Sequence, residues 1–225
     1  MSLGLRILKR RRKVDAASIA QFDGIPVANV SDSMWRVAAA GPRIRPMHAG
    51  APLAGPALTV KTRPGDNLLL HKAIDLAEPG DVIVVDGGGD LTNALMGELM
   101  LAHAAKRGVG GFVLDGAIRD AGALRAQDLP VFAAGVTHRG PYKDGPGEIN
   151  VPIAIDGMVI EPGDLVLGDE DGVVAVPFDQ VREVAAAARK KQDAEAETVR
   201  EIADGRWDRT WVDATLKRLG CEIEE

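Results

Sequence analysis

Short apolar runs separated by helical segments constrain the fold of this chain more than any other feature. The runs are DVIVVDGGG from Asp81, GFVLDG from Gly111 and PVFAAGV from Pro130. Apolar stretches of this length, bounded by Gly, Asp and Pro, are typical of buried strands. Strands that alternate with helical segments form βα units, so the sequence predicts a parallel sheet at the centre of the fold.

The segments around these runs predict the other elements of the core. GELMLAHAAKRG, residues 97–108, consists mostly of good helix formers, carries basic residues in its last turn and ends at a glycine. We expect a strand in PALTVKT and a helix in GDNLLLHKAIDLAEPGD. Upstream, ASIAQFDGIPVANVSDSMWRVAAAG predicts two short helices, the second capped by Ser31 or Asp32 and ended by Gly41.

The pattern changes after residue 150. VPIAIDGMVIEPGDLVLGDEDGVVAVP has short apolar runs split by Asp-Gly and Pro-Gly pairs, which predicts antiparallel hairpins. A long helix is expected from Phe178, and its polar middle, RKKQDAEAE, indicates packing against another subunit. RWDRTWVDATLKRLG predicts a further helix with Trp207 and Trp211 on one side.

Together these elements predict a single α/β domain. It is a layered sandwich in which a sheet of βα units carries a second β layer and outer helices. We expect a helical arm over residues 1–24, the α/β core over residues 25–177, and C-terminal helices between subunits over residues 178–225.

Composition and charge exclude several classes of protein. The net charge of −6 disfavours non-specific nucleic-acid binding, and the basic run Lys9–Lys13 lacks interleaved aromatics, so we interpret it as a solvated face. No apolar stretch approaches the roughly 20 residues needed to span a membrane, and no secretory signal is present. Cys221 is the single cysteine, which suits a reducing cytosol. We therefore expect a cytoplasmic protein that binds neither nucleic acid nor membranes.

Candidate site residues follow two neighbouring elements of the expected sheet. Gly97 opens a helix, and Arg119 and Asp120 follow the next strand. These loops can meet at the carboxyl edge of a parallel sheet, where ligands bind. A helix N-terminus binds carboxylates, an aspartate binds hard cations with water, and an arginine hydrogen-bonds substrate oxygens. A turn glycine and a weak surface ion pair explain the same residues, and the spacing leaves both interpretations open.

The four histidines do not have the spacing of a metal site. His103 lies within an apolar helix, and we expect it to be packed in the core. GDEDG, residues 168–172, contains enough carboxylates for a cation but is better interpreted as a hairpin turn.

The stretch GELMLAHAAKRGVGGFVLDGAIRD resembles the core of the class II 4-hydroxy-4-methyl-2-oxoglutarate / 4-carboxy-4-hydroxy-2-oxoadipate aldolases. These enzymes belong to the wider superfamily of the regulator of ribonuclease E activity A. VSDSM, LAGPALTVKT, GDVIVVDGGGD and IEPGDLVLGDEDGVVAVP fit as well, so the resemblance extends from about Ile25 to Pro177. The marker of the family is an acidic residue, twenty intervening residues and then Arg-Asp. Glu98 and Arg119-Asp120 match it, with Glu where Asp is commoner.

The resemblance implies a role for each of these residues. Arg119 contacts the keto oxygen of a 2-keto acid substrate, and Asp120 binds Mg²⁺ or Mn²⁺ with water completing the shell. Glu98 occupies the acidic position of the catalytic set. The pyruvoyl carboxylate of the substrate is bound by the backbone amides of Gly97, Glu98, Leu99 and Met100. The implied fold is a β/β/α sandwich of the swivelling-domain type.

The resemblance also implies an activity and an assembly. The activity is metal-dependent cleavage of 4-hydroxy-2-oxo acids to pyruvate and a keto acid, accompanied by oxaloacetate decarboxylation through the same pyruvate enolate. The assembly is a homotrimer or homohexamer with sites between subunits, to which Glu195 or Glu197 of a neighbour contributes. The alternatives are a non-enzymatic regulator that binds an RNA-processing enzyme, and an enzyme of the same fold with an unrelated keto or hydroxy acid substrate. The regulators lack the aspartate at position 120, which favours an enzyme.

Overall fold

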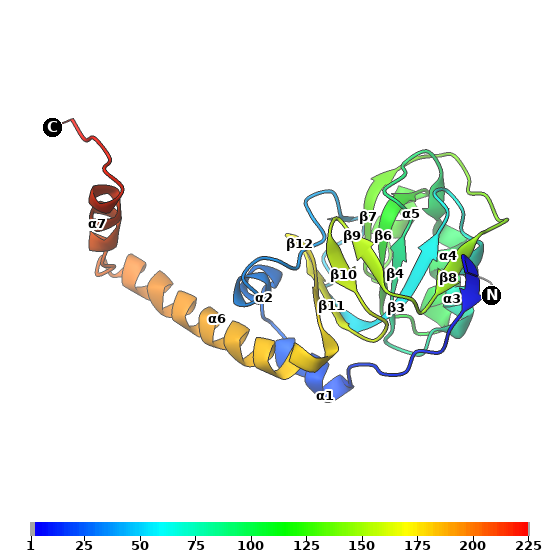
Figure 1. The fold of residues 1–225 in the computed structure, drawn as a ribbon, viewed down its shortest axis with the longest axis horizontal. Coiled ribbons are helices and arrows are strands. Elements are labelled where there is room, and N and C mark those ends of the chain that lie inside the picture. The colour runs from blue at the N-terminus through cyan, green and yellow to red at the C-terminus, as the bar shows by residue number, and fades with distance from the viewer. Residues whose placement is uncertain (1–2, 225) are drawn as a thin grey trace.

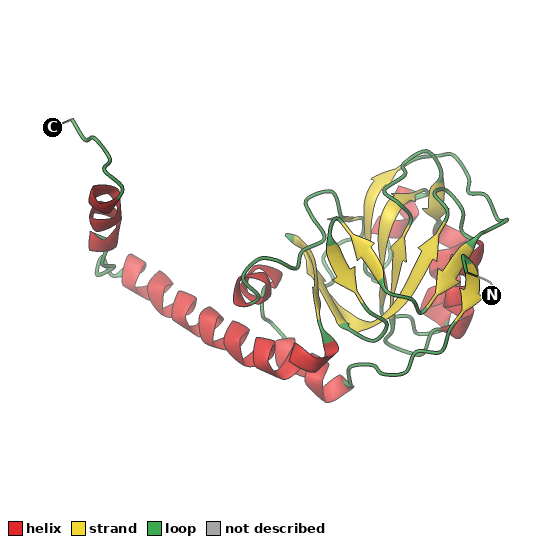
Figure 2. Cartoon of the chain, in the orientation of Figure 1, coloured by secondary structure: helices red, strands yellow, loops and turns green. Residues whose placement is uncertain are grey.

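The computed structural model describes residues 3–224, which form a layered α/β body with a projecting helical arm (Figures 1 and 2). The helices, with two 3₁₀ turns written η, are α1 Ala16–Ile19, η1 Ala20–Phe22, α2 Val27–Ser33, α3 Leu68–Leu76, α4 Glu98–Lys106, α5 Ala121–Arg125, η2 Phe178–Gln180, α6 Val181–Ala203 and α7 Thr210–Arg218. The strands are β1 Leu5–Ile7, β2 Arg45–Pro46, β3 Leu53–Thr62, β4 Val82–Asp86, β5 Ala94–Met96, β6 Gly111–Ile118, β7 Val131–Val136, β8 Gly147–Ile149, β9 Ile153–Ile155, β10 Met158–Ile160, β11 Leu165–Asp169 and β12 Gly172–Val176.

The main sheet has the strand order β1-β8-β3-β4-β6-β7-β2. Its central strands β3, β4, β6 and β7 are parallel to one another, which confirms the βα units expected from the apolar runs. Strand β5 pairs in parallel with the end of β6, with Met96 opposite Ile118. This pairing places the residues that follow the two strands next to each other at one edge of the sheet.

Alternating side chains on the central strands build the layers. On β4, Ile83 and Val85 belong to the core that includes α3 and α4, whereas Val82 and Val84 belong to the core shared with β9, β10 and β12. A third core joins the outer face of β11 and β12 to α2 and the start of α6. Because successive side chains on a strand point to opposite faces, each central strand contributes apolar side chains to the cores on both sides of the sheet. The predicted layered sandwich is confirmed.

The hairpins after residue 150 form at the turn signals. Strands β9 and β10 pair around Asp156 and Gly157, which both have positive φ, as Asp-Gly turns require. Strands β11 and β12 pair around the GDEDG segment, which confirms that it is a turn.

Helix α4 forms where the sequence predicts it, but α2 has other ends than expected. It begins after Pro26, so Ser31 and Asp32 lie within the helix and do not cap its start. It ends at Ser33 because Trp35 and Arg36 both have positive φ, long before Gly41. Proline at the start of the helix costs no hydrogen bond there, which explains why it takes the position expected for a polar cap.

Residues 3–24 form a strap across the body and not the helical arm expected for residues 1–24, of which residues 1 and 2 lie outside the described part. Strand β1 pairs in parallel with β8 at the edge of the main sheet. An extended stretch follows, and helix begins only at α1. Strand β3 pairs with only one edge of β8. The other edge offers backbone hydrogen bonds to residues 5–7, which explains why they form a strand and not a helix.

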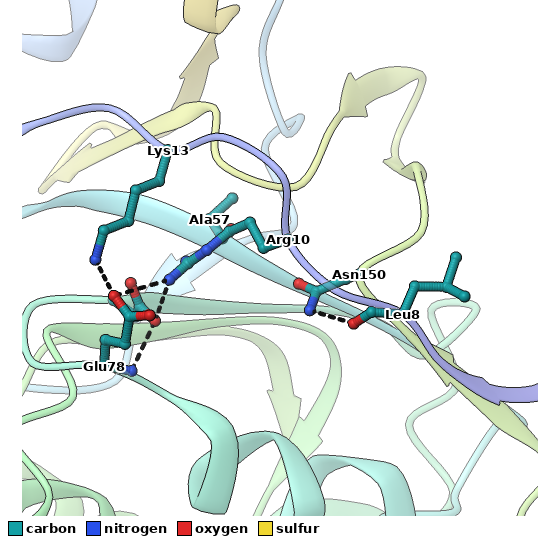
Figure 3. Close-up of polar contacts among 7 residues, drawn as sticks. Leu8, Arg10, Lys13, Ala57, Glu78 and Asn150 are labelled. Atoms are coloured by element: carbon teal, nitrogen blue, oxygen red, sulfur yellow. Dashed lines mark hydrogen bonds and ion pairs between the residues drawn. The ribbon is translucent and has the colours of Figure 1, made fainter.

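The basic run in this strap is anchored by ion pairs (Figure 3). Arg10 Nη2 lies 2.8 Å from Asp81 Oδ2, and the two side chains are 10% and 0% exposed. Lys13 pairs with Glu78, close to the same arginine. The run is therefore not simply a solvated face, because the buried Asp81 carboxylate needs a cationic partner.

The C-terminal helices leave the body as an arm. The first turns of α6 pack against the core through residues such as Val184 and Ala188, and its middle contacts α2 through Glu195. The end of α6 and α7 extend away from the body (Figure 1). Trp207 precedes α7 and so is not on that helix, whereas Trp211 is on it and mostly exposed. Across residues 3–224, no helix combines the length and apolar character that a membrane span requires.

Candidate functional site

A pocket of about 260 Å³ lies at the sheet edge where β5 meets β6. It is bounded by α3, the start of α4 and the segment between β7 and β8. Its lining residues are Asn67, His71, Leu95, Met96, Gly97, Leu99, Met100, Arg119, Gly140, Pro141 and Lys143. Four of the predicted site residues, Gly97, Leu99, Met100 and Arg119, thus share one cavity.

The structure brings Gly97 and the Arg119-Asp120 pair into contact. The Glu98 N–H donates a hydrogen bond of 3.1 Å to Asp120 Oδ2, and Arg119 Nε lies 3.6 Å from the same oxygen. The Arg119 N–H donates to the Met96 carbonyl at 2.9 Å, which fixes the two loops together. A carboxylate at a helix N-terminus is electrostatically favourable, so Asp120 stabilises the start of α4.

Asp120 has an unusual backbone conformation. Its φ of 56° and ψ of 36° place it in the left-handed region immediately before α5. Aspartate tolerates this region better than most residues, but the conformation still costs about 1 kcal/mol or more. The conformation turns the side chain back toward α4, where it meets the Glu98 amide.

The first turn of α4 offers free backbone donors to the pocket. Within the described chain, the first intrahelical bond of this turn runs from the Leu101 N–H to the Gly97 carbonyl at 3.2 Å. The N–H groups of Leu99 and Met100 are therefore available to an anion, as expected for a helix N-terminus. Gly97 is buried, and any side chain there would meet Asp120 and Arg119.

The side chains of the same turn divide between pocket and solvent. Met100 is buried and lines the cavity, whereas Glu98 is exposed and Leu99 is 81% exposed. The Glu98 side chain does not line the pocket within residues 3–224, so its contribution inside this chain is the backbone amide that holds Asp120.

Three polar lining residues were not predicted from the sequence: Asn67, His71 and Lys143. Partial desolvation lowers the pKa of His71, and the nearby Lys143 ammonium lowers it further, which favours the neutral imidazole. His71 and Lys143 are far apart in the sequence and share no motif, so only the fold reveals that they are neighbours. His103, expected in the core, is instead exposed and lies 3.4 Å from Asp75, because it falls on the outer face of α4.

Asp66 holds the wall that carries Lys143. Its buried carboxylate accepts hydrogen bonds from the N–H groups of Asp144 and Gly145, both at 2.8 Å, and from the Leu68 N–H at 2.9 Å. The Asn67 N–H donates to the Tyr142 carbonyl at 3.0 Å on the same wall. The residues that begin α3 thus set the position of the segment before β8.

Asp120 is also the carboxylate that fits a divalent cation in this region. Within residues 3–224, no three His, Cys, Asp or Glu side chains are grouped as a metal site, so a cation here would have one protein carboxylate. Asp120 Oδ1 accepts no hydrogen bond from the described chain, and the side chain is 42% exposed. Mg²⁺ commonly keeps most of its water and binds through one or two carboxylates, so this donor fits such an ion.

The two glutamates expected from a neighbour lie on the arm. Glu195 accepts a hydrogen bond from Asn29 Nδ2 at 2.6 Å and pairs with Lys191 at 3.0 Å, and these contacts lower its pKa. Glu197 pairs with Arg200. Neither lines the pocket of its own chain in the described residues, so a contribution to a site would be made to another copy.

Comparisons with known proteins identify the family of this chain. A sequence model of the RraA-like family, described as Aldolase/RraA, matches residues 27–175. A relative from Halalkalibacterium halodurans, named "Putative 4-hydroxy-4-methyl-2-oxoglutarate aldolase", is 43% identical over 186 residues, which are 83% of this chain and 89% of the relative.

Solved structures share the fold. An uncharacterized protein from Pseudomonas syringae pv. tomato has a TM-score of 0.77 and 27% identity, and the match covers 86% of this chain and 95% of that chain. The RNA-processing inhibitor RraA from Thermus thermophilis has a TM-score of 0.62 and 33% identity, over 68% of this chain and 92% of that chain. The chain therefore belongs to the RraA-like family.

Proposed function

We propose that this protein is a divalent-metal-dependent aldolase that cleaves 4-hydroxy-2-oxo acids to pyruvate and a second keto acid. We propose that it also decarboxylates oxaloacetate. The observation that carries the proposal is the convergence of the α4 N-terminus and Arg119 on one pocket, with Asp120 bound to the same turn. The name of the relative from H. halodurans supports the aldolase class.

The pocket offers donors for each oxygen of a pyruvoyl group. The free N–H groups of Leu99 and Met100 suit the carboxylate, and the Arg119 guanidinium suits the keto oxygen. Gly97 lines the pocket and has no side chain to keep the substrate away from the backbone. These donors orient the C2 carbonyl against the cationic side chain.

The same donors stabilise the product of bond cleavage. In the aldol reaction the C4 hydroxyl gives its proton to water in the pocket, and C4 becomes the carbonyl of the second keto acid as the C3–C4 bond breaks. The electron pair of that bond forms the C2–C3 double bond, and the C2 oxygen becomes the oxyanion of a pyruvate enolate, which is then protonated at C3. Oxaloacetate gives the same enolate when CO₂ leaves, and protonation at C3 then yields pyruvate. A divalent cation at Asp120, Mg²⁺ or Mn²⁺, supplies Lewis-acid stabilisation of the developing charge. Arg119 adds a fixed donor to that oxygen, an effect typically worth about 3–4 kcal/mol.

A regulator of an RNA-processing enzyme is the second candidate. It is favoured by the similarity to the T. thermophilis protein, whose title describes an RNA-processing inhibitor. A protein that acts only by binding has no need for a carboxylate held in a left-handed conformation beside a helix N-terminus.

A pyruvate-release assay distinguishes the two candidates. Oxaloacetate and 4-hydroxy-4-methyl-2-oxoglutarate are supplied with Mg²⁺, with Mn²⁺ and after treatment with EDTA. We expect pyruvate release that is lost with EDTA and restored by either metal. Asp120→Asn should depress pyruvate release. Asp128→Asn removes an exposed carboxylate that does not line the pocket, so this control should leave release unchanged. Full activity after exhaustive chelation, or no pyruvate from either substrate, would contradict the proposal.

A further inference from the structure

Asn67 stands at the position that caps α3, but its side chain does not cap the helix. Asparagine at this position normally accepts a hydrogen bond from one of the first helical N–H groups. Here the neighbouring Asp66 carboxylate accepts from the Leu68 N–H. The Asn67 side chain is therefore released from the role that its position suggests.

The orientation of the Asn67 amide is fixed by its neighbours. Its Nδ2 donates a hydrogen bond of 2.9 Å to the Leu95 carbonyl and lies 3.3 Å from Met100 Sδ. The reversed amide would place two oxygen acceptors against each other at the Leu95 carbonyl, so the assignment follows from chemistry. Asn67 Oδ1 is consequently the amide atom that takes no part in these two contacts.

This Oδ1 atom has no hydrogen-bond donor within residues 3–224, and Asn67 is 2% exposed. A buried acceptor that lacks a donor is costly, and most such groups in proteins find a partner. Asn67 lines the pocket together with Met100, whose flexible thioether already contacts the amide. Methionine side chains shift readily, so a ligand in the pocket can reach the oxygen when Met100 moves.

Arg119, Lys143 and the amides of the α4 N-terminus supply hydrogen-bond donors to the pocket. His71 also lines it and offers one donor and one acceptor nitrogen when neutral, but it is exposed, whereas Asn67 is buried. The donors suit carboxylate and keto oxygens, which only accept. A neutral acceptor beside them suits a ligand group that donates. In an ionised 4-hydroxy-2-oxo acid, the group that can donate is the C4 hydroxyl.

We propose that Asn67 Oδ1 accepts a hydrogen bond from the C4 hydroxyl of the substrate and so selects 4-hydroxy-2-oxo acids over analogues without this hydroxyl. The inference rests on the proposed aldolase function and adds a specificity-determining residue to it. Sites built to hydrogen-bond a substrate hydroxyl reject analogues without it much more strongly than apolar sites reject small differences in size.

Two measurements test the selection. In the parent protein treated with EDTA, where the proposed cleavage does not occur, calorimetry should give tighter binding for 4-hydroxy-2-oxoglutarate than for 2-oxoglutarate, by about tenfold or more. In Asn67→Leu, which is similar in size and has no polar atoms, kcat/KM for 4-hydroxy-4-methyl-2-oxoglutarate should fall about tenfold or more beyond any fall for oxaloacetate. Oxaloacetate has no C4 hydroxyl and serves as the internal control.

Asn67→Leu also removes the donor to the Leu95 carbonyl, so a general disturbance of the pocket must be separated from loss of the acceptor. Such a disturbance would lower kcat/KM for both substrates equally, and that result would overturn the inference. So would equal affinity of the parent for the two oxoglutarates, a measurement that requires no variant to fold. If the parent binds the hydroxylated ligand preferentially but releases no pyruvate from any substrate, the proposed function fails while the recognition by Asn67 stands.

Discussion

Replacement of Gly97 by alanine tests whether the start of α4 and the Arg119-Asp120 pair act as one unit. A Cβ atom at Gly97 would lie 2.5 Å from Asp120 Oδ2 and 3.0 Å from the Cγ and Nε atoms of Arg119. The φ of Gly97 is −149°, an extended conformation open to any residue. The conflict is therefore with the two side chains and not with the backbone.

The expected loss of stability is smaller than the expected loss of activity. The Asp120 carboxylate must withdraw by about 1 Å, which weakens its hydrogen bond with the Glu98 N–H. Because this side chain is 42% exposed, it can rotate toward solvent, and we expect the free energy of unfolding to fall by only about 1–2 kcal/mol. Misplacement of a reacting group by about 1 Å costs on the order of a hundredfold in rate, so kcat for oxaloacetate should fall by about that factor.

The assay combines steady-state kinetics on oxaloacetate across a Mg²⁺ titration with urea denaturation. Gly122→Ala is the matched control, because a Cβ there meets no described atom within 4 Å. Gly122 lies in α5, where alanine is favoured over glycine by about 0.5–1 kcal/mol, so this control should retain activity and gain stability. A Gly97→Ala variant whose kcat stays within about twofold of the parent would refute the reasoning.

Three further predictions concern the metal site, the N-terminal strap and the assembly. In the same Mg²⁺ titration, Asp120→Asn should raise the Mg²⁺ concentration needed for activity. Arg119→Lys should keep the metal dependence but lose about a hundred- to a thousandfold in kcat. If both variants turn over at the parental rate, the pair is only a surface turn. Arg10→Met should lower the free energy of unfolding by about 3–5 kcal/mol because it leaves the buried Asp81 unpaired, while exposed Arg11→Met should not, as measured by urea midpoints. Light scattering should show a homotrimer or a dimer of trimers, and a stable, active monomer of 23.7 kDa would exclude a shared site.

The layers could be predicted from the sequence because local patterns determine them. The apolar runs that form β4, β6 and β7 are recognisable from their own hydrophobic pattern and from the Gly, Asp and Pro residues that bound them. The Asp-Gly turn of β9 and β10 depends on two adjacent residues that accept positive φ. Such features need no knowledge of distant contacts.

The N-terminal strap could not be predicted in the same way. Arg10 is separated from Asp81 by 71 residues, and nothing near Arg10 marks it as the member of the basic run that becomes buried. Strand β1 likewise forms because β8, more than a hundred residues later, offers an open edge. Charge patterning describes the run as a whole, whereas its structure depends on one long-range pair.

Asn67 shows why part of the candidate site remains hidden in the sequence. An asparagine before a helix is ordinarily interpreted as a cap, and the sequence contains Asp66 and Asn67 side by side as equal candidates. Only the folded structure distinguishes them. There the Asp66 carboxylate accepts hydrogen bonds from the N–H groups of Asp144 and Gly145, and it also accepts from the first N–H group of the helix, that of Leu68. Asn67 is then free to hydrogen-bond the Leu95 carbonyl beside the predicted anion site. A motif search finds residues that chemistry requires at fixed spacing, such as Glu98 and Arg119-Asp120, but it does not find a residue whose role depends on what its neighbour does.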